Sequence, residues 1–339
     1  MGRARAQADA SRWRRTDAPR GRRTAAARRR SIPWSRSRSG AAARRANVSE
    51  RCVGVIGGSG LYEMEGFAEL REVRVRTPFG DPSDAILCGE LRAPQGNVRL
   101  AFLPRHGRGH RYSPSTIPYR ANLWALKSLG CTEILSVSAV GSMREDLHPG
   151  DFVIVDQFFD RTMGRASTFF GTGLVAHVMF ADPLCKELGD LLYEQGRALS
   201  IPIHRGGTYL CMEGPAFSTR AESRIYRQWG VDVIGMTNLT EAKLAREAEI
   251  SYATIAMVTD YDCWHEEHDA VTVDAVVAVM RSNVGKAKAL LAATAPRLAQ
   301  PLACACKDAL KSAIMTHREA IDPAMAEALR PIVGRYLGG

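Results

Sequence analysis

The sequence lacks a CxxC motif, a run of 18 apolar residues and, within its first 50 residues, any lysine. Its eight cysteines show no zinc-finger spacing and mostly stand in apolar segments, so we expect reduced, buried thiols in a cytoplasmic protein. Without a long apolar run, a membrane span is not expected. Cys304 and Cys306 are the one closely spaced cysteine pair in the sequence. A redox role for them is less favoured than simple burial.

The formal net charge of +10 arises in the N-terminal segment, residues 1–50, which holds 15 arginines and three acidic residues. The remaining 31 basic and 33 acidic residues nearly cancel, so no nucleic-acid partner is expected for the body. The segment lacks apolar periodicity, which predicts disorder. Three interpretations stay open: a transit peptide, a nucleic-acid-binding arm, or translated upstream sequence with a start near Val48. We favour the third, because arginine without lysine is typical of GC-rich coding sequence.

Strand and helix patterns alternate along the body. Helices are predicted over 119–130, over 217–230 with a capping box at Thr219, after Asn238 with Glu241 three residues on, and from 272 to 291. These patterns predict an α/β protein, with a single domain over 51–300 built on a mixed central β-sheet flanked by helices, and a helical extension over 301–339. The predicted strands are Val53–Ile56, Val98–Leu103, Ile134–Ala139, Phe152–Val155, Val231–Ile234 and Tyr252–Val258.

A glycine-rich loop, GGSG, follows the first predicted strand. Counted from Gly58, the third glycine of a dinucleotide-binding loop is replaced by Glu63, and the loop has no lysine for a nucleoside triphosphate. Its backbone N–H groups and the Ser59 hydroxyl still suit a small anion. The alternative is a tight turn without a ligand.

Polar side chains follow several other predicted strands, where ligands of α/β folds gather. Arg105 and His106 come after one strand, and arginine presents a planar fork of donors to phosphate. Ser138 and Thr237 add hydroxyl groups at two more strand ends. Together with the glycine loop, these residues predict a cradle for a free phosphate. A surface salt bridge is the alternative for the Arg-His pair.

Two carboxylates, Asp260 and Asp262, follow the last predicted strand. In an extended segment they would point to the same side, and two neighbouring acids push their pKa values apart. One acid is then expected to donate a hydrogen bond and the other to accept one. A solvated turn or a metal site is the alternative; a metal is less favoured because Tyr261, Cys263 and Trp264 add no hard ligand.

Long segments of the body resemble one family. They are GVIGGSGLYE, TPFGDPSDAI, LPRHGRGHRYSPSTIPYRANLWALKSLGC, GSMREDLHPGDFVIVDQFFDRT, MEGPAFSTRAESRIYRQWGVDVIGMT and ATIAMVTDYDCW. Their order and content resemble the 5′-methylthioadenosine phosphorylases of the trimeric purine nucleoside phosphorylase group. The resemblance implies a homotrimeric cytoplasmic pentosyltransferase that cleaves methylthioadenosine reversibly into adenine and 5-methylthioribose 1-phosphate, in purine and methionine salvage. Inorganic phosphate is then a co-substrate, and neither a metal nor an organic cofactor is implied.

The resemblance also implies a set of site residues. Catalysis is expected from Asp260 and Asp262, and phosphate binding from Ser59, Arg105, His106, Ser138, Ala139 and Thr237. Substrate binding is expected from Met236 along the ribose and from Phe217, Asp260, Tyr261 and Asp262 around the base. His177 would close over the 5′ group from a neighbouring subunit, residues 310–315 would cover the thioether, and Ser218 and Val273 would tune specificity.

Three rival functions stay open. The nearest is a 6-oxopurine or methylthioinosine phosphorylase, which would present Asn rather than Asp at position 260; Asp262 suits the 6-amino group of adenine. A nucleic-acid-associated protein would use the N-terminal segment in a salt-dependent manner. A module that binds a nucleoside without turnover would have no use for the acid pair and the phosphate residues.

Overall fold

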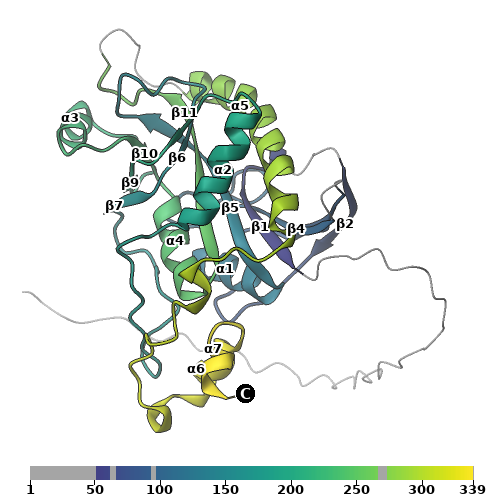
Figure 1. Ribbon diagram of the computed structural model, residues 1–339. Helices are drawn as coiled ribbons and strands as arrows, with labels where there is room; N and C mark the ends of the chain where they lie inside the picture. Colours follow the sequence, from purple (N-terminus) through teal and green to yellow (C-terminus); the bar gives the residue numbers. More distant parts are fainter. Residues whose placement is uncertain (1–50, 62–65, 93–96, 266–272, 339) are drawn as a thin grey trace, which may run out of the picture. The chain divides into compact units, whose positions relative to one another are not determined.

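The computed structural model describes residues 51–61, 66–92, 97–265 and 273–338. Within these residues the chain forms a mixed eleven-stranded sheet with helices on both faces (Figure 1). The strands are β1 (Cys52–Gly57), β2 (Phe67–Val73), β3 (Ile86–Leu91), β4 (Val98–Pro104), β5 (Cys131–Ser142), β6 (Phe152–Ile154), β7 (Gln157–Arg161), β8 (Ile203–Arg205), β9 (Thr208–Met212), β10 (Val233–Gly235) and β11 (Ser251–Asp260).

The helices lie between these strands and after the last one. They are α1 (Tyr119–Ser128), α2 (Lys186–Ala198), α3 (Arg220–Gln228), α4 (Asn238–Glu247), α5 (Val273–Thr294), α6 (Pro323–Ala328) and α7 (Arg330–Leu337). Short 3-10 helices add η1 (Ser59–Leu61), η2 (Ala295–Ala299), η3 (Ala305–Asp308) and η4 (Arg318–Ala320). Among the described residues, no helix is both long enough and apolar enough to cross a bilayer.

Strand β5 is the branch point of the sheet. It pairs in parallel with β1 on one side and with β11 on the other, and its last residues pair antiparallel with β10. One branch continues from β1 through β4 to the antiparallel edge strands β3 and β2, and another from β10 through β9 to β7. Because β1, β4, β5 and β11 are parallel, their carboxyl ends open at the same edge of the sheet.

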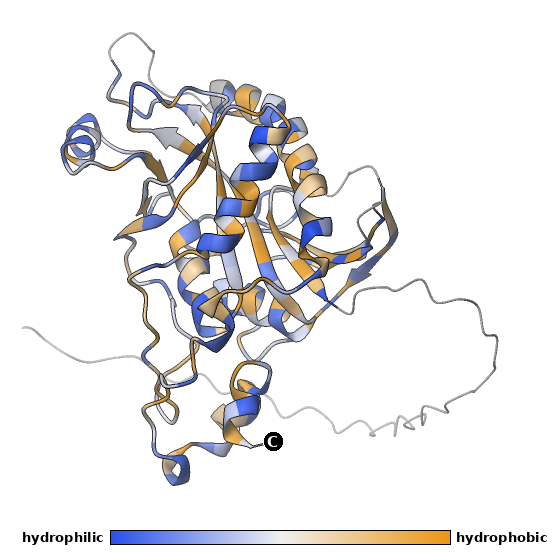
Figure 2. Ribbon diagram, viewed as in Figure 1, coloured by the Kyte–Doolittle hydropathy of each residue, from blue (hydrophilic) through white to orange (hydrophobic). Residues whose placement is uncertain are grey.

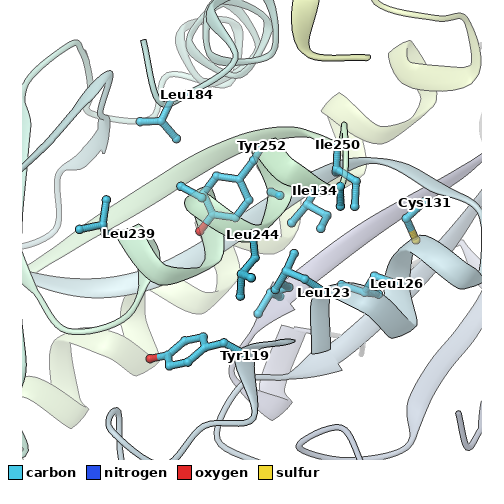
Figure 3. Packing of buried hydrophobic residues seen from close by; sticks show 14 of the residues in the cluster. Tyr119, Leu123, Leu126, Cys131, Ile134, Leu184, Leu239, Leu244, Ile250 and Tyr252 are labelled. Atoms are coloured by element: carbon cyan, nitrogen blue, oxygen red, sulfur yellow. The ribbon is translucent and has the colours of Figure 1, made fainter. Parts of the chain in front are cut away.

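Alternate residues of the central strands enter two separate cores. On β11, Tyr252 belongs to the cluster formed with α1 and α4, whereas Ala253 and Ile255 belong to the cluster formed with α2 and α5. Figure 2 shows the resulting apolar strands between helices that are hydrophilic on one side, and Figure 3 shows the packing of Leu123 and Leu244 in the first cluster. A strand buried on both faces reads as a continuous apolar run, as predicted.

All six predicted strands are present, and the mixed sheet flanked by helices is confirmed. The capping box between Thr219 and Glu222 is also confirmed. The expected start of the helix after Asn238 is wrong: Thr237 is the N-cap, and Glu241 is buried in the core rather than turned back to cap the helix. Residues 301–338 contain only short helical pieces, because few apolar residues recur there at helical spacing.

Candidate active site

A cavity of about 770 Å³ opens at the carboxyl ends of the parallel strands. It is large enough for a nucleoside together with a small anion. The cavity brings together most of the residues that the sequence predicted for the site: Arg105, His106, Ser138, Ala139, Phe217, Met236, Thr237, Asp260 and Asp262. These residues come from the ends of β4, β5, β10 and β11 and from the segment before α3, so only the fold assembles them.

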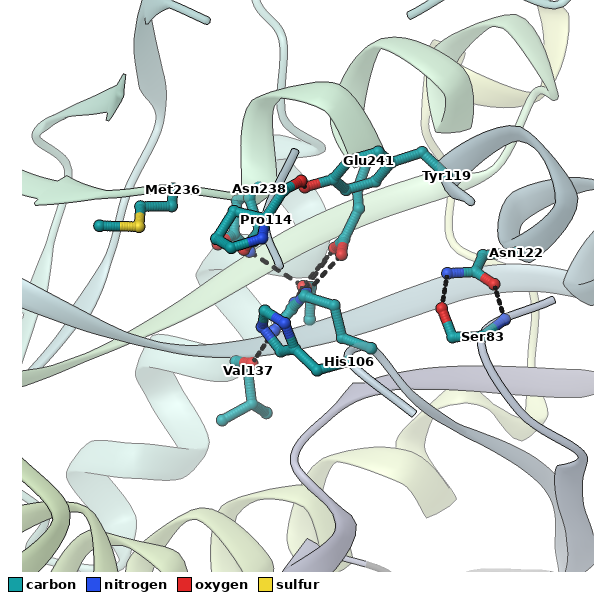
Figure 4. Close-up of polar contacts among 12 residues, drawn as sticks. Ser83, His106, Pro114, Tyr119, Asn122, Val137, Met236, Asn238 and Glu241 are labelled. Atoms are coloured by element: carbon teal, nitrogen blue, oxygen red, sulfur yellow. Dashed lines mark hydrogen bonds and ion pairs between the residues drawn. The ribbon is translucent and has the colours of Figure 1, made fainter. Parts of the chain in front are cut away.

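Arg105, at one end of the cavity, is held by a buried ion pair. Its Nε donates to Glu241 Oε1 at 2.5 Å and its Nη2 to Glu241 Oε2 at 3.2 Å. Nη2 also donates to Ser136 Oγ and Nη1 to the Val137 carbonyl oxygen. Figure 4 labels Glu241 and Val137, which lie on opposite sides of this group of contacts. Of the five N–H donors of a guanidinium, these contacts leave one without a partner among the described residues. The Arg105 guanidinium, which the sequence predicted to bind phosphate, therefore binds the Glu241 carboxylate instead. Glu241 neutralises the positive charge of Arg105.

His106 stands beside this ion pair as a neutral imidazole. Burial and the adjacent Arg105 charge lower the pKa of His106 to about 4. Its Nδ1 lies 2.8 Å from the Tyr112 carbonyl oxygen, and a carbonyl can only accept, so Nδ1 carries the proton. The ring stacks on His110 with 4.2 Å between centroids, and both rings line the cavity.

Two buried hydroxyl-bearing residues, Ser138 and Thr237, and a helix N-terminus complete this end. The hydroxyl of Ser138 lies beside that of Tyr209, and neither makes a hydrogen bond of normal geometry among the described residues. Thr237 is the N-cap of α4, but its side chain makes no capping bond to the helix. Uncapped N–H groups carry the positive end of the helix dipole, and such N-termini bind anions. Neutral donors thus dominate this end of the cavity.

The acid pair lies elsewhere along the cavity wall. Asp260 accepts hydrogen bonds from the Thr259 hydroxyl at 2.7 Å and from the Asp262 backbone N–H at 2.8 Å. Asp262 accepts from the Ser223 hydroxyl at 2.5 Å. Burial raises the pKa of Asp260, and the neighbouring Asp262 charge adds to this effect. The pKa of Asp260 is thus shifted in the direction that a proton donor needs.

The expectation that both acids extend from one strand is wrong. Strand β11 ends at Asp260, and Asp262 has φ of 52°, in the left-handed region. Both carboxylates line the cavity because the chain turns between them. Gly141 permits this turn: a Cβ atom there would lie 2.9 Å from Asp260 Oδ1 and 3.3 Å from the Asp262 nitrogen.

Apolar side chains form the rest of the wall. Met280 and Val284 come from α5, where they continue the stripe that farther along the helix packs Ala287 and Leu291 into the core. Phe217, before α3, and Met236, after β10, line other parts of the cavity. The N-terminal half of the apolar stripe predicted for this helix thus lines the cavity, and its C-terminal half packs into the core.

Other predicted residues lie outside the cavity of this chain. His177 is exposed, and its backbone N–H donates to the Ala313 carbonyl oxygen at 2.8 Å. Tyr261 and Ser218 are neighbours of lining residues but do not line the cavity, and neither does any of residues 310–315. The side chains of Ser59 and Val273 lie outside the described residues, although Gly58 and Gly60 on either side of the first do line the cavity.

Comparison with known proteins places the chain in a family. Residues 53–295 match the model of the phosphorylase superfamily. An S-methyl-5′-thioadenosine phosphorylase of Geobacter sulfurreducens is 56% identical over 289 residues, which are 85% of this chain and 100% of that protein. The chain belongs to the phosphorylase superfamily. Another S-methyl-5′-thioadenosine phosphorylase, of Rhodospirillum rubrum, is 56% identical over 84% of this chain and 97% of its own length.

Solved phosphorylase structures share the fold. A methylthioadenosine phosphorylase from an antarctic soil metagenomic library matches with a TM-score of 0.78 at 48% identity, covering 83% of this chain and 98% of its own. The Schistosoma mansoni methylthioadenosine phosphorylase in complex with adenine matches with a TM-score of 0.72 at 39% identity, covering 78% and 99% of the two chains. The nucleoside phosphorylase fold predicted from the sequence is confirmed.

Sequence reasoning missed two residues of this phosphorylase site. Glu241 was interpreted as a helix-start residue, but its position within the apolar stretch of α4 was a sign of a buried carboxylate that needs a cation. Gly141 was passed over in the Val140-Gly141-Ser142 segment, because nothing local shows that a carboxylate from another strand approaches its Cα. The arrangement places hydroxyl and N–H donors at one end of the cavity and two carboxyl groups along another part of its wall.

Proposed function

We propose that this chain catalyses the reversible phosphorolysis of S-methyl-5′-thioadenosine to adenine and 5-methylthioribose 1-phosphate. The observation that carries the proposal is that one cavity contains both the anion-binding end around His106 and the acid pair of Asp260 and Asp262. Relatives of over 50% identity across nearly their whole length are named for this substrate. We also propose that the enzyme acts in purine and methionine salvage in the cytoplasm.

In the proposed reaction, phosphate attacks C1′ of the ribose while the C1′–N9 bond breaks. Positive charge develops on the sugar, negative charge builds on the purine, and the phosphate dianion stabilises the sugar from beneath. Neutral donors from Ser138, Thr237 and the start of α4 suit this task, because they hold the phosphate without neutralising it. Fixed dipoles aimed at developing charge are usually the largest single contribution to catalysis. Ser59, Arg105 and Ala139 are proposed to complete the cradle.

Asp260 is proposed to donate a proton to N7 of the leaving adenine. Burial raises the pKa of Asp260, which is the direction that this role needs. Thr259 Oγ1 lies within 3.2 Å of the Val140 carbonyl oxygen as well as near Asp260, so its hydrogen has an alternative acceptor when Asp260 is protonated. General acid catalysis of this kind contributes about 10²–10⁴-fold.

Asp262 is proposed to accept from the 6-amino group of the base. The Ser223 hydroxyl donates to one of its oxygens, so the carboxylate is held as an acceptor and the other oxygen remains for the substrate. A 6-oxo group is itself an acceptor, so it could not donate a hydrogen bond to the Asp262 carboxylate. A 6-oxopurine nucleoside is therefore the disfavoured substrate. Met236 and Phe217 are proposed to contact the ribose and the base, with Tyr261 and Ser218 supporting them from behind.

We further propose a homotrimer in which His177 reaches the neighbouring subunit's cavity. In a single chain His177 is exposed, and the segment around it carries large exposed apolar side chains: Met179 is 86% and Val175 38% exposed. Residues 313–315 pair with this segment through the bridge between Ala176 and Ile314. Light scattering that found a fully active monomer would contradict this assembly.

A substrate panel tests the proposed function. Methylthioadenosine, adenosine, methylthioinosine and inosine are incubated with the full chain, with and without phosphate, and the released base is measured. We expect phosphate-dependent release of adenine, fastest from methylthioadenosine. Release of base without phosphate would indicate hydrolysis instead, and a preference for methylthioinosine would support the 6-oxopurine rival.

A further inference from the structure

Three cysteines far apart in the sequence meet at one place in the fold. Cys185 is the N-cap of α2, Cys304 is the N-cap of η3, and Cys306 lies within η3. Their Sγ atoms all lie within 4.8 Å of one another. The sequence drew attention only to the Cys304-Ala-Cys306 pair; the fold adds a third thiol from the start of a helix.

The surroundings of the three thiols are enclosed. Cys185, Cys304 and Cys306 are only 2%, 9% and 8% exposed, and all belong to the core between the sheet and the α2–α5 pair. Two polar groups adjoin them: the Ser251 hydroxyl lies 3.1 Å from Cys304 Sγ, and Glu187 Oε2 lies 3.4 Å from Cys185 Sγ. Buried cysteines ordinarily pack singly as small apolar residues, so three converging sulfur atoms need a separate reason.

The end of one helix adjoins the cluster. Cys185 stands at the N-terminus of α2, where the helix dipole stabilises negative charge. A thiolate is the form in which cysteine binds a metal.

We propose that Cys185, Cys304 and Cys306 bind one thiophilic d10 metal ion, Zn(II) or Cu(I), through three thiolates. Zinc–sulfur bonds are about 2.3 Å long, so sulfur atoms around one ion lie about 4 Å apart. The separations observed here fit that geometry with little movement. On binding, three S–H bonds break, three metal–sulfur bonds form and the protons pass to solvent. Soft thiolate ligands select these ions over calcium or magnesium.

The site would serve structure rather than turnover. None of the three cysteines lines the cavity. Cys304 contacts Ser251 at the start of β11, whereas Asp260 is at the end of that strand, about 30 Å away at roughly 3.3 Å per residue. The ion would tie the C-terminal segment to α2 and β11. That segment continues to residues 313–315, which bridge to the segment around His177.

The test uses the reduced full chain and cadmium(II) as a spectroscopic stand-in for zinc. We expect one Cd(II) per chain with the ultraviolet charge-transfer band of cadmium–thiolate bonds, and displacement of Cd(II) by Zn(II) or, without oxygen, by Cu(I). Cys304→Ser should weaken binding by about a hundredfold or more, since loss of an outer partner alone costs about 10–100-fold. Cys131→Ser is the matched control: it removes a buried thiol 3.4 Å from Cys52 Sγ, outside the cluster, and should keep the ion.

A second measurement needs no variant. Alkylation of the parent chain, followed by mass spectrometry, gives the labelling rate of each cysteine with and without Zn(II). Zinc should slow the labelling of Cys185, Cys304 and Cys306 at least about tenfold and leave Cys263 unchanged. Equal binding by the parent and Cys304→Ser, loss of binding in Cys131→Ser, or a Cys304–Cys306 disulfide in protein purified under reducing conditions would each overturn the proposal. Turnover should be unchanged by the ion, so failure here leaves the proposed phosphorolysis untouched.

Discussion

Replacement of Glu241 with Gln should destabilise the chain and make its stability depend on phosphate. Glu241 accepts hydrogen bonds at 2.5 and 3.2 Å from Arg105 and at 2.8 Å from each of the hydroxyls of Ser136 and Tyr252. Glutamine preserves the shape but removes the negative charge, and its amide N–H₂ faces groups that donate. Arg105, 3% exposed, is then left as an uncompensated buried cation beside the cavity.

The size of the effect follows from the burial of the pair. Removal of one partner of a buried ion pair costs about 3–5 kcal/mol. At about 2–4 °C per kcal/mol for a chain of this size, the melting temperature should fall by about 6–20 °C. Phosphate in the cavity would restore a negative charge near Arg105. The variant should therefore gain more thermal stability from phosphate than the parent does.

Thermal unfolding in a phosphate titration measures both effects. The matched control is Lys186→Gln, which opens the exposed pair between Lys186 and Asp190, worth about 0–1 kcal/mol. It should move the melting temperature by no more than about 4 °C and leave the response to phosphate unchanged. An equal phosphate-dependent rise in the parent and Glu241→Gln would refute the idea that Arg105 and the anion are electrostatically coupled.

Three further changes address the base, the pH dependence and the N-terminal segment. Asp260→Asn keeps a donor but loses the transferable proton, so the ratio of kcat/KM for methylthioadenosine over methylthioinosine should fall by about 10²-fold or more. Burial raises the pKa of Glu247 to about 7 from 4.5, so the protonated form is favoured in the folded state. The stability that this raised pKa contributes is complete below pH 4.5 and is lost as pH rises to about 7. The change in unfolding free energy is on the order of 3 kcal/mol. Glu247→Gln should therefore flatten the profile of unfolding free energy against pH. A chain that begins at Val48 should keep its specific activity, because segment 1–50 cannot bury a core.

Each of these has a contrary result. An unchanged substrate ratio in Asp260→Asn would remove the acid pair from base recognition. A Glu247→Gln profile as steep as the parent's between pH 4.5 and 7 would assign the slope to another group. Loss of turnover in the shortened chain, measured as adenine release, would give segment 1–50 a role in the enzyme.

The order of strands and helices was largely readable from the sequence. Strands buried on both faces appear as apolar runs, and the ends of α1 and α3 carry Gly130 and Gly230 with positive φ. These signals are local, since they depend on residues within one or two turns of each other. The exposed edge strand β2 has no such run, and it acquires its structure from pairing with β3.

The sequence predicted which residue types form the site but not which of them contact one another. Asp260 ends β11 and His106 follows shortly after β4, at the strand ends where ligands of this fold class gather. The sequence also offered the Arg105 fork for an anion, but only the tertiary structure brings it to Glu241, 136 residues away. The partner of a buried charged group is the group that the packed core places beside it. Contacts between residues far apart in the sequence therefore determine this pairing.

The sequence by itself thus determined the family, the residue types at the strand ends and most element positions, because each rests on local pattern or on collinear matches. Tertiary structure alone decided which groups touch: the pairing of Arg105 with Glu241, the approach of Asp260 to Gly141, and the meeting of Cys185 with Cys304. The physical reason is that hydrogen bonds and metal–ligand bonds act over about 2–3 Å. The number of residues between two groups in the sequence does not give the distance between them. That distance is set only when the sheet and its helices have packed.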